Sequence, residues 1–345
     1  MEQKYEVTIG IPVYNAEKHI RLTMDSVLAQ TFQSIEFLVL DDCGTDSSMD
    51  IVREYQQNHP RGKDIHVVRQ PENGGIGCAR NRIVDEAQGV YLYFIDADDA
   101  IVPNTIELLY ENAQKYDADI VYGSYERIEE FDETSKNTLF QYPNLQFLKE
   151  NEFADRVYSQ YGFLQANVWN FLLKRDIYLK NGLRFKKVNY WEDFCITINL
   201  PVYIHRAVLL SDITYFYYCH YGSLSIFEKR SHIDKEEIQK TIHAMGEVKR
   251  NYECVQSKPY FYKWMYKVMM THFYMVCSIL KNEKIIFPAF TKREIRDVMK
   301  SPLSFAETRQ LRWRYKNLFF YSLGVLYPSL AVALMRIIAR LRGLL

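Results

Sequence analysis

The stretch VYLYFIDADD, residues 90–99, is an aliphatic and aromatic run that ends abruptly in three carboxylates. The apolar part is typical of a β-strand buried on both faces. Asp96, Asp98 and Asp99 do not suit such a strand, because carboxylates are rarely buried unless they are paired or bind a cation. Two interpretations are open: the carboxylates bind a ligand, or Asp98 or Asp99 caps the helix expected near Asn104.

Four further apolar runs alternate with helical patterns over the first 125 residues. The runs span residues 7–11, 35–40, 65–69 and 119–123, and helices are expected at 16–30 and from near Asp46, Gly77 and Asn104. Strands that alternate with helices in this way predict an α/β fold with a mostly parallel sheet covered on both faces. In such sheets the ligand binds at the carboxyl ends of the strands.

Polar and acidic residues follow four of these strands, where a ligand is expected. They are Pro12-Val13-Tyr14-Asn15, Asp41-Asp42, Asn73-Gly74-Gly75 with Arg80, and Asp96-Ala97-Asp98-Asp99. An Asp-x-Asp sequence supplies only oxygen ligands, which suit Mg²⁺ or Mn²⁺ shared with substrate phosphates. The sequence therefore indicates a ligand site at this edge of the sheet, with the Asp-x-Asp sequence as a candidate set of metal ligands.

Each of these residues also has an ordinary structural interpretation. Tyr14 is either a ring that stacks on a base or a partly buried tyrosine. Asp41 and Asp42 either accept hydrogen bonds from a base or ribose, or begin a turn before a helix. Residues 73–75 allow close approach of a ligand but are also a plain turn signal. Arg80 either points back at the site or lies on a solvated helix face.

The composition excludes some classes of protein. Lys plus Arg and Asp plus Glu are both 43, so the chain lacks the basic excess typical of nucleic-acid-binding proteins. The six cysteines are scattered and none are paired at metal-ligand spacing, which favours reduced thiols in the cytosol. A strand follows the first five residues, so no signal peptide is expected. We therefore expect a cytoplasmic protein that does not bind nucleic acid.

The ordered set of motifs resembles the family-2 glycosyltransferases of the GT-A fold. The matching pieces are VTIGIPVYNAEKHI (7–20), VLDDCGTDSS (39–48), NGGIGCARN (73–81), YFIDADD (93–99), VWNFLLKRD (168–176) with NGLRF (181–185), and WEDFCIT (191–197). They cover about residues 5–225 in the family's order. One departure is Cys43-Gly44, where the family usually has Gly-Ser, and it removes no acidic residue.

The resemblance implies roles for the residues at the strand ends. The nucleotide sugar usually carries uracil as its base in this family. The resemblance implies that it is held by Pro12, Val13, Tyr14, Asp41 or Asp42, Asn73, Arg80 and Ala97. Asp96 is implied to contact the ribose or the metal, and Asp98 to bind the Mg²⁺ or Mn²⁺ that bridges the diphosphate. His220 and Ser223 stand where the family often has phosphate contacts, and a structural histidine is an equal alternative.

The same resemblance assigns the general base to the segment WEDF, residues 191–194. Asp193 is implied to take the proton of the attacking hydroxyl. Trp191 and Glu192 are placed on the acceptor or phosphate side. The alternative is that Glu192 and Asp193 are present only because acidic side chains are favourable at the N-terminus of a helix, here expected at 193–203.

The implied function is inverting transfer of a sugar from a UDP-sugar to a glycan or lipid-linked acceptor in cell-surface polysaccharide synthesis. One alternative is a sugar nucleotidyltransferase, but that class has a glycine-rich loop after the first strand instead of Pro-Val-Tyr-Asn. The other is an inactive nucleotide-sugar-binding protein. We expect a catalytic domain at 1–225, with donor and acceptor halves meeting near 125, a helical extension at 226–310 and a separate tail at 311–345.

The tail has a pattern that the catalytic motifs do not explain. Residues 317–335 carry no charge, and basic residues flank them on both sides. This length is marginal for a membrane span, and Pro328 is expected to kink or split the helix. We predict a helix attached peripherally to the inner face of the cytoplasmic membrane. The alternative is a buried C-terminal helix packed on the rest of the chain.

Overall fold

The computed structural model describes residues 5–129, 137–160, 164–188, 191–220 and 231–345. The chain forms two compact units. The first, here called the sheet unit, comprises Met1–Phe153, Ala166–Lys187 and Tyr203–Ser225. The second, the helical unit, comprises Ala154–Gln165, Val188–Val202 and Ile226–Leu345. Residues 188–202 thus belong to the helical unit, although they lie within the predicted catalytic domain.

The sheet unit contains a mixed sheet with the order β3-β2-β1-β4-β9-β6-β10-β5. Its parallel half consists of β1 (Val7–Val13), β2 (Ile35–Asp41), β3 (Ile65–Arg69) and β4 (Tyr91–Phe94). The other half contains β9 (Phe171–Lys174), β6 (Ile120–Glu129) and β10 (Ala207–Cys219), with short antiparallel strands β5 (Ala100–Ile101), β7 (Thr138–Phe140) and β8 (Leu145–Phe147). The predicted α/β class is confirmed. The antiparallel β9, which separates β4 from β6, is a feature that the sequence does not predict.

Helices cover both faces of this sheet, as predicted. Those of the parallel half are α1 (Ile20–Leu28), α2 (Ser48–Asn58), α3 (Ile76–Glu86) and α4 (Thr105–Tyr116). Alternate β1 residues such as Ile9 pack with Ile20 of α1 and Ile106 of α4 in one core cluster. Gly10 faces the other side, where an added Cβ would lie 2.5 Å from Ile83 of α3. Strand residues are therefore apolar on both sides, which is why their sequences lack alternation.

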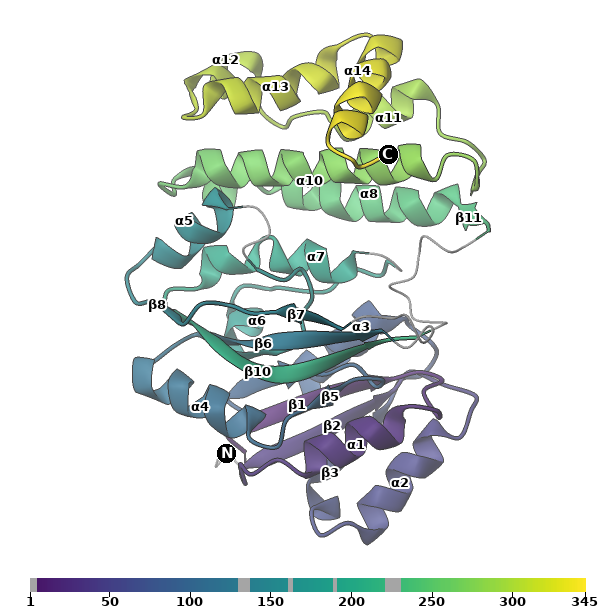
Figure 1. Ribbon diagram of the computed structural model, residues 1–345, viewed down its shortest axis with the longest axis vertical. Helices are drawn as coiled ribbons and strands as arrows, with labels where there is room; N and C mark the ends of the chain where they lie inside the picture. The colour runs from purple at the N-terminus through teal and green to yellow at the C-terminus, as the bar shows by residue number, and fades with distance from the viewer. Residues whose placement is uncertain (1–4, 130–136, 161–163, 189–190, 221–230) are drawn as a thin grey trace. The chain divides into compact units, whose positions relative to one another are not determined.

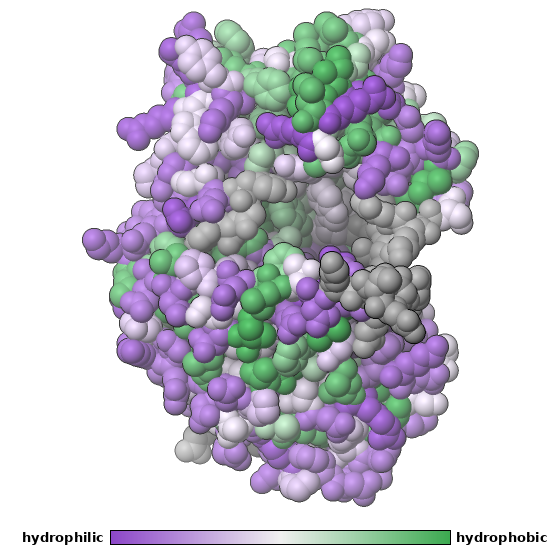
Figure 2. Space-filling model, viewed as in Figure 1, coloured by the Kyte–Doolittle hydropathy of each residue, from purple (hydrophilic) through white to green (hydrophobic). Residues whose placement is uncertain are grey.

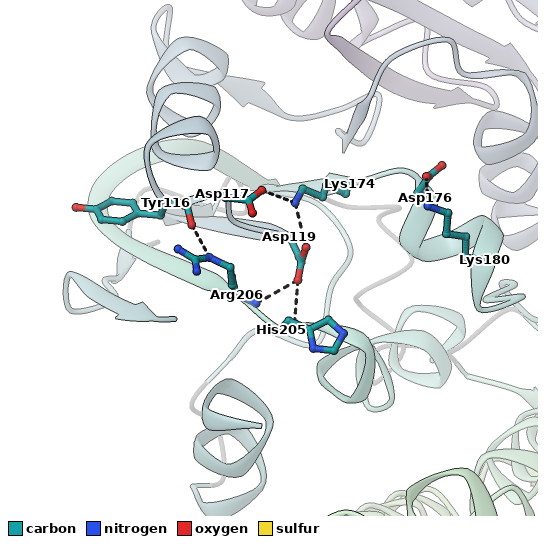
Figure 3. A network of polar contacts seen from close by, with 8 residues as sticks. All are labelled: Tyr116, Asp117, Asp119, Lys174, Asp176, Lys180, His205 and Arg206. Atoms are coloured by element: carbon teal, nitrogen blue, oxygen red, sulfur yellow. Dashed lines mark hydrogen bonds and ion pairs between the residues drawn. The ribbon is translucent and has the colours of Figure 1, made fainter. Parts of the chain in front are cut away.

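A polar network fixes the start of β10 to the rest of the sheet unit (Figure 3). The Asp119 carboxylate accepts hydrogen bonds from the backbone N–H groups of His205 and Arg206 at 2.8 and 3.1 Å. Its other oxygen lies 3.2 Å from Nζ of Lys174 at the end of β9. The Arg206 guanidinium donates to the carbonyl of Tyr116 at the end of α4. This network sets the position from which β10 runs across the sheet.

The helical unit is built around α10 (Phe261–Lys281), which lies beside α8 (Lys235–Arg250), α13 and α14 (Figure 1). Its other elements are the 154–159 part of α5 (Glu152–Ser159), α7 (Glu192–Thr197), most of η2 (Leu200–Tyr203), α9 (Glu253–Gln256), α11 (Lys292–Val298), α12 (Phe305–Gln310), α13 (Arg314–Val325), α14 (Pro328–Leu341) and the strands β11 (Ile233–Asp234) and β12 (Ile286–Phe287). Trp264 and Val268 of α10 are fully buried. Among the described residues, α8 with 16 residues and α10 with 21 are the longest helices.

Pro328 splits the tail into two helices, as predicted. α13 ends at Val325 and α14 begins at Pro328, a position where the missing N–H costs no helical hydrogen bond. Phe320 of α13 and Met335 of α14 are buried in the helical unit. Among the described residues, no helix combines the length and hydrophobicity that a membrane span requires. One face of the tail therefore packs on the chain, as the second interpretation held.

Candidate active site

The carboxyl ends of the parallel strands place the predicted donor residues at one edge of the sheet. Val13 of β1 pairs with Asp41 of β2, and Asp41 pairs with Arg69 of β3. The backbone N–H of Asp42 donates to the carbonyl of Val13 at 3.0 Å. Tyr14 is 53% exposed, so its ring is accessible to a ligand.

Asp42 holds the loop that follows β3. Its two carboxylate oxygens accept hydrogen bonds from the N–H groups of Gly74 and Gly75, both at 2.9 Å. Asp42 is 3% exposed, and Gly75 has φ +78°, a conformation that favours glycine. The side chain of Asp42 therefore sets the shape of the Asn73-Gly74-Gly75 loop.

Asp41 faces a small cavity of about 150 Å³ that Val13, Asn15, Gly44 and Arg69 also line. One Asp41 oxygen accepts from the N–H of Cys43 at 2.9 Å, and the other lies 3.5 Å from Nε of Arg69. Small-molecule sites usually exceed about 300 Å³, so the cavity suits part of a nucleotide sugar.

Cys43 stands where the family usually has glycine, and its φ is +61°. An L-residue is disfavoured in this left-handed region, which gives the departure from the motif a conformational cost. The thiol hydrogen-bonds the carbonyl of Gln70 at 3.2 Å, so Cys43 also joins the loops after β2 and β3.

Two polar residues to which the sequence assigns no site role, Asn15 and Asp46, join the first two loops. Asn15 accepts a hydrogen bond from the N–H of Thr45 at 2.8 Å. Asp46 accepts from the N–H of Glu17 at 2.9 Å and from the Ser48 hydroxyl at 2.5 Å. Both residues lie within the motifs 7–20 and 39–48, but their pairing depends on the β1–β2 contact.

Arg80 points from α3 to the acidic end of β4. Its Nη2 donates to Asp96 at 2.9 Å, and its guanidinium carbon lies 5.7 Å from the Phe185 ring centroid. Arg80 is 2% exposed, so the interpretation as a solvated arginine is wrong. The charge-assisted hydrogen bond from this buried arginine fixes the direction of the half-buried Asp96 carboxylate.

Asp98 and Asp99 are neighbours with opposite surroundings. Asp99 is fully buried and accepts hydrogen bonds from the Tyr215 hydroxyl at 2.5 Å and the Tyr218 N–H at 2.8 Å. Burial, and then the charges of Asp98 and Asp96, raise the pKa of Asp99 well above its usual value. The Asp98 side chain is 31% exposed and contacts His220, whose Nε2 lies 2.9 Å from its Oδ2.

Neither Asp98 nor Asp99 caps α4. The N-cap residue is Asn104, and no side chain makes a cap hydrogen bond there. The capping interpretation is therefore wrong, and Asp99 instead connects the end of β4 to β10.

His220 stacks on His19, a residue to which the sequence gives no role. The two ring centroids are 4.1 Å apart with an interplanar angle of 11°. His19 is the N-cap residue of α1 and lies within the motif of residues 7–20, which is the signal that points to it. Ser223 lies outside the described residues.

The oxygens at the end of β4 suit a divalent cation that is also bound by phosphates. In the part of the chain that the structure describes, no three His, Cys, Asp or Glu side chains are grouped to hold a metal ion. Mg²⁺ is usually bound by one or two protein carboxylates together with substrate phosphates. Asp98 and Asp96 fit this arrangement, because both side chains are partly exposed.

The model of glycosyl transferase family 2 matches residues 8–183. The chain belongs to glycosyl transferase family 2. It is 27% identical over 229 residues to the glycosyltransferase GlyG of Streptococcus pneumoniae, covering 63% of this chain and 72% of GlyG.

Solved structures show that this glycosyltransferase has the GT-A fold. The Staphylococcus aureus TarS 1–349 complex with UDP-GlcNAc matches with a TM-score of 0.56 and 17% identity, over 92% of this chain and 90% of that one. The Pyrobaculum calidifontis mannosyltransferase PcManGT, in complex with GDP-Man and Mn²⁺, matches with a TM-score of 0.50 and 14% identity, over 97% of this chain and 88% of that one.

The remaining predicted residues of this glycosyltransferase lie in the helical unit. Glu192 and Asp193 form the first turn of α7, preceded by Trp191 in a left-handed conformation with φ 61°. The Trp191 ring lies 5.8 Å from that of Phe194. The helix predicted at 193–203 is divided into α7 and η2. The structure thus gathers Arg80, Asp96, Asp98 and His220 in the sheet unit, whereas residues 191–193 belong to the other unit.

Proposed function

We propose that this glycosyltransferase moves a hexose from a UDP-sugar to a hydroxyl of a glycan or lipid-linked acceptor, with inversion, in cytoplasmic synthesis of a cell-surface polysaccharide. The observation that carries the proposal is the cluster at the end of β4. There a buried Arg80 directs Asp96, and a partly exposed Asp98 lies beside His220. The similarity to TarS, which binds UDP-GlcNAc, supports the choice of donor.

In this proposal the base of the nucleotide binds beside Asp41. The cavity along Asp41 is lined by Val13, and Tyr14 is exposed next to it. The base of the nucleotide would stack on the Tyr14 ring and donate a hydrogen bond from its N–H to the Asp41 carboxylate. The backbone of Pro12 would also contact the base. Asp42 contributes through the loop that it holds, which contains Asn73.

We propose Asp98 and Asp96 as ligands of a Mg²⁺ or Mn²⁺ ion, with Ala97 as the small residue between them. The bound ion would neutralise charge on the leaving diphosphate. The presence of Mn²⁺ in the PcManGT complex supports metal use in this fold. His220 Nε2 lies within hydrogen-bond distance of Asp98 Oδ2, an oxygen that the proposed metal ion would also use. When the donor binds, His220 would therefore either move aside or contact the phosphates.

We propose Asp193 as the general base that takes the proton from the acceptor hydroxyl. A base acting on the face opposite the leaving group gives inversion of configuration. Trp191 and Glu192 would contact the acceptor. The half-buried first turn of α7 supports this assignment, because it presents two adjacent acids on one short helix.

Release of free UDP from a panel of UDP-sugars tests the proposal, with and without acceptor and with Mn²⁺ or EDTA. We expect UDP release that requires the metal and rises with acceptor. No release with any nucleotide sugar would indicate the inactive binding protein. Formation of a nucleotide sugar from a sugar phosphate and UTP would indicate a nucleotidyltransferase instead.

A further inference from the structure

The helix α14 is apolar on two opposite faces, although only one of them is buried. Ala331, Val332, Met335 and Ala339 are buried where α14 packs with α10 and α11. An ordinary surface helix has polar residues on its other side. Here the second side carries large hydrophobic residues, so packing within the helical unit does not explain it.

The exposed side of α14 forms a continuous apolar stripe. Leu330, Ile337 and Leu341 are 56%, 54% and 83% exposed, and Tyr327 just before the helix is 76% exposed. Spacings of seven and four residues place the three aliphatic side chains on one face. Hydrophobic surface covers α14 beside strongly hydrophilic side chains in the space-filling view (Figure 2). Exposed apolar surface of this kind usually marks an interaction site.

The charged residues of the tail itself are all basic. Between Thr308 and Leu345 the chain has seven basic residues and no acidic residue. Arg336 pairs with Glu283 of the turn after α10. Arg340 and Arg342, beside Leu341, form no ion pair within the described residues and are exposed.

We propose that this outer face of α14 docks in the headgroup region of a membrane that contains anionic lipid. Tyr327, Leu330, Ile337 and Leu341 would enter the interface while Arg340 and Arg342 contact lipid phosphates. Apolar residues on one helix face with flanking arginines are the pattern of interfacial helices. A second copy of the chain is a poorer occupant, because a two-fold interface would bring these arginines together.

This docking goes beyond the transfer reaction and is tested without it. The full chain is mixed with vesicles of phosphatidylcholine alone, or with phosphatidylglycerol added, and the bound fraction is measured by sedimentation. We expect binding only to the anionic vesicles, weakened by salt. The Arg340→Gln, Arg342→Gln double variant should lose more than tenfold in affinity, since each arginine contributes about fivefold near an anionic surface.

The Ile337→Glu, Leu341→Glu double variant should not bind, at an unchanged melting temperature. The matched control is Leu139→Glu in β7, because Leu139 is 55% exposed and lies in the sheet unit. This control should bind like the parent. Absence of vesicle binding by the parent overturns the proposal, and so does equal binding by the Glu double variant. A parent dimer that Ile337→Glu dissociates, without vesicle binding, would show that a second copy covers the face.

Discussion

The two acidic segments of this glycosyltransferase are held in different ways. At the end of β4, Asp96, Asp98 and Asp99 contact Arg80, His220 and Tyr215, which come from distant parts of the sheet unit. At the start of α7, Glu192 and Asp193 form the first turn of a six-residue helix in the helical unit. Long-range contacts within the sheet unit fix the first set, whereas the second set begins a short helix of the other unit. With the roles proposed above, substitutions in the first set should alter donor binding, and those in the second should alter the transfer step.

The largest expected effect separates the two segments through Asp193→Asn. Asparagine has nearly the same shape but cannot accept the hydroxyl proton. Transfer should fall by roughly 10²- to 10⁴-fold, the range for a positioned general base, while the affinity for UDP stays unchanged. Initial rates of transfer and calorimetric UDP titration measure the two quantities. A retained anomeric configuration in the product, or near-normal transfer, would disprove the role.

A second experiment compares the neighbours Asp98 and Asp99. Asp98→Asn should remove the effect of Mn²⁺ on UDP affinity, because the carboxylate proposed as a metal ligand becomes a neutral amide. Asp99→Asn is the matched control. The amide can still accept from the Tyr218 N–H and donate to the Tyr215 oxygen, and it avoids a buried charge.

Fluorescence titration of UDP with Mn²⁺ or EDTA checks this pair of variants. Equal metal dependence in folded Asp98→Asn and in the parent would contradict the metal assignment. A loss of metal dependence in both variants would show that the whole β4 end, rather than the Asp98 oxygens, is responsible.

A smaller effect is expected at Asp42, within the strand-end region. The two carboxylate oxygens of Asp42 accept from the N–H groups of Gly74 and Gly75. In Asp42→Asn one of these oxygens is replaced by an NH₂ group, which can only donate. The unpaired buried donor should lower the free energy of unfolding by about 1–3 kcal/mol. Urea denaturation measures the loss, and faster amide exchange at Gly74 and Gly75 would localise it. Unchanged exchange at these glycines would contradict the loop-holding role.

The last expected effect appears only in the pH dependence of stability and concerns a buried charge in the helical unit. Lys249 is 8% exposed and donates to the carbonyl of Val298 at 3.0 Å. Burial lowers the pKa of Lys249 from 10.5 to about 7. Between these two values the unfolded chain binds more protons than the folded one, so this residue makes stability rise with pH there. The free-energy cost of burying a charged Lys249 is fully present below pH 7.

In Lys249→Met the free energy of unfolding should rise less steeply with pH, by about 1 kcal/mol per pH unit between pH 7.5 and 9.5. Denaturation midpoints of parent and variant across this range check the prediction. Lys240→Met is a suitable control, because Lys240 is an exposed lysine of the same helix. Identical pH dependence of parent and Lys249→Met would disprove it.

Apart from the short strand β5, the main helices and strands of the first 125 residues could be predicted from sequence, because each depends on a local pattern. The apolar runs at 7–11, 35–40 and 65–69 coincide closely with β1, β2 and β3. The proline that divides α13 from α14 acts locally too, since it lacks an N–H at its own position. The residue types at the strand ends also follow from order along the chain. The sequence alone therefore determined the α/β class, the edge of the sheet where polar residues gather and the division of the tail.

Only the tertiary structure decided which partner each side chain has. His220 meets Asp98 across 122 positions, and Tyr215 meets Asp99 across 116. The contact of Tyr215 with Asp99 accompanies the antiparallel pairing of β10 with β5, which places Phe216 opposite Ala100 and which no local pattern records. Both faces of α14 carry large apolar residues in the sequence, and packing on α10 and α11 decides which one is buried. Local propensity sets an element's type, but burial and pairing are properties of the assembled chain.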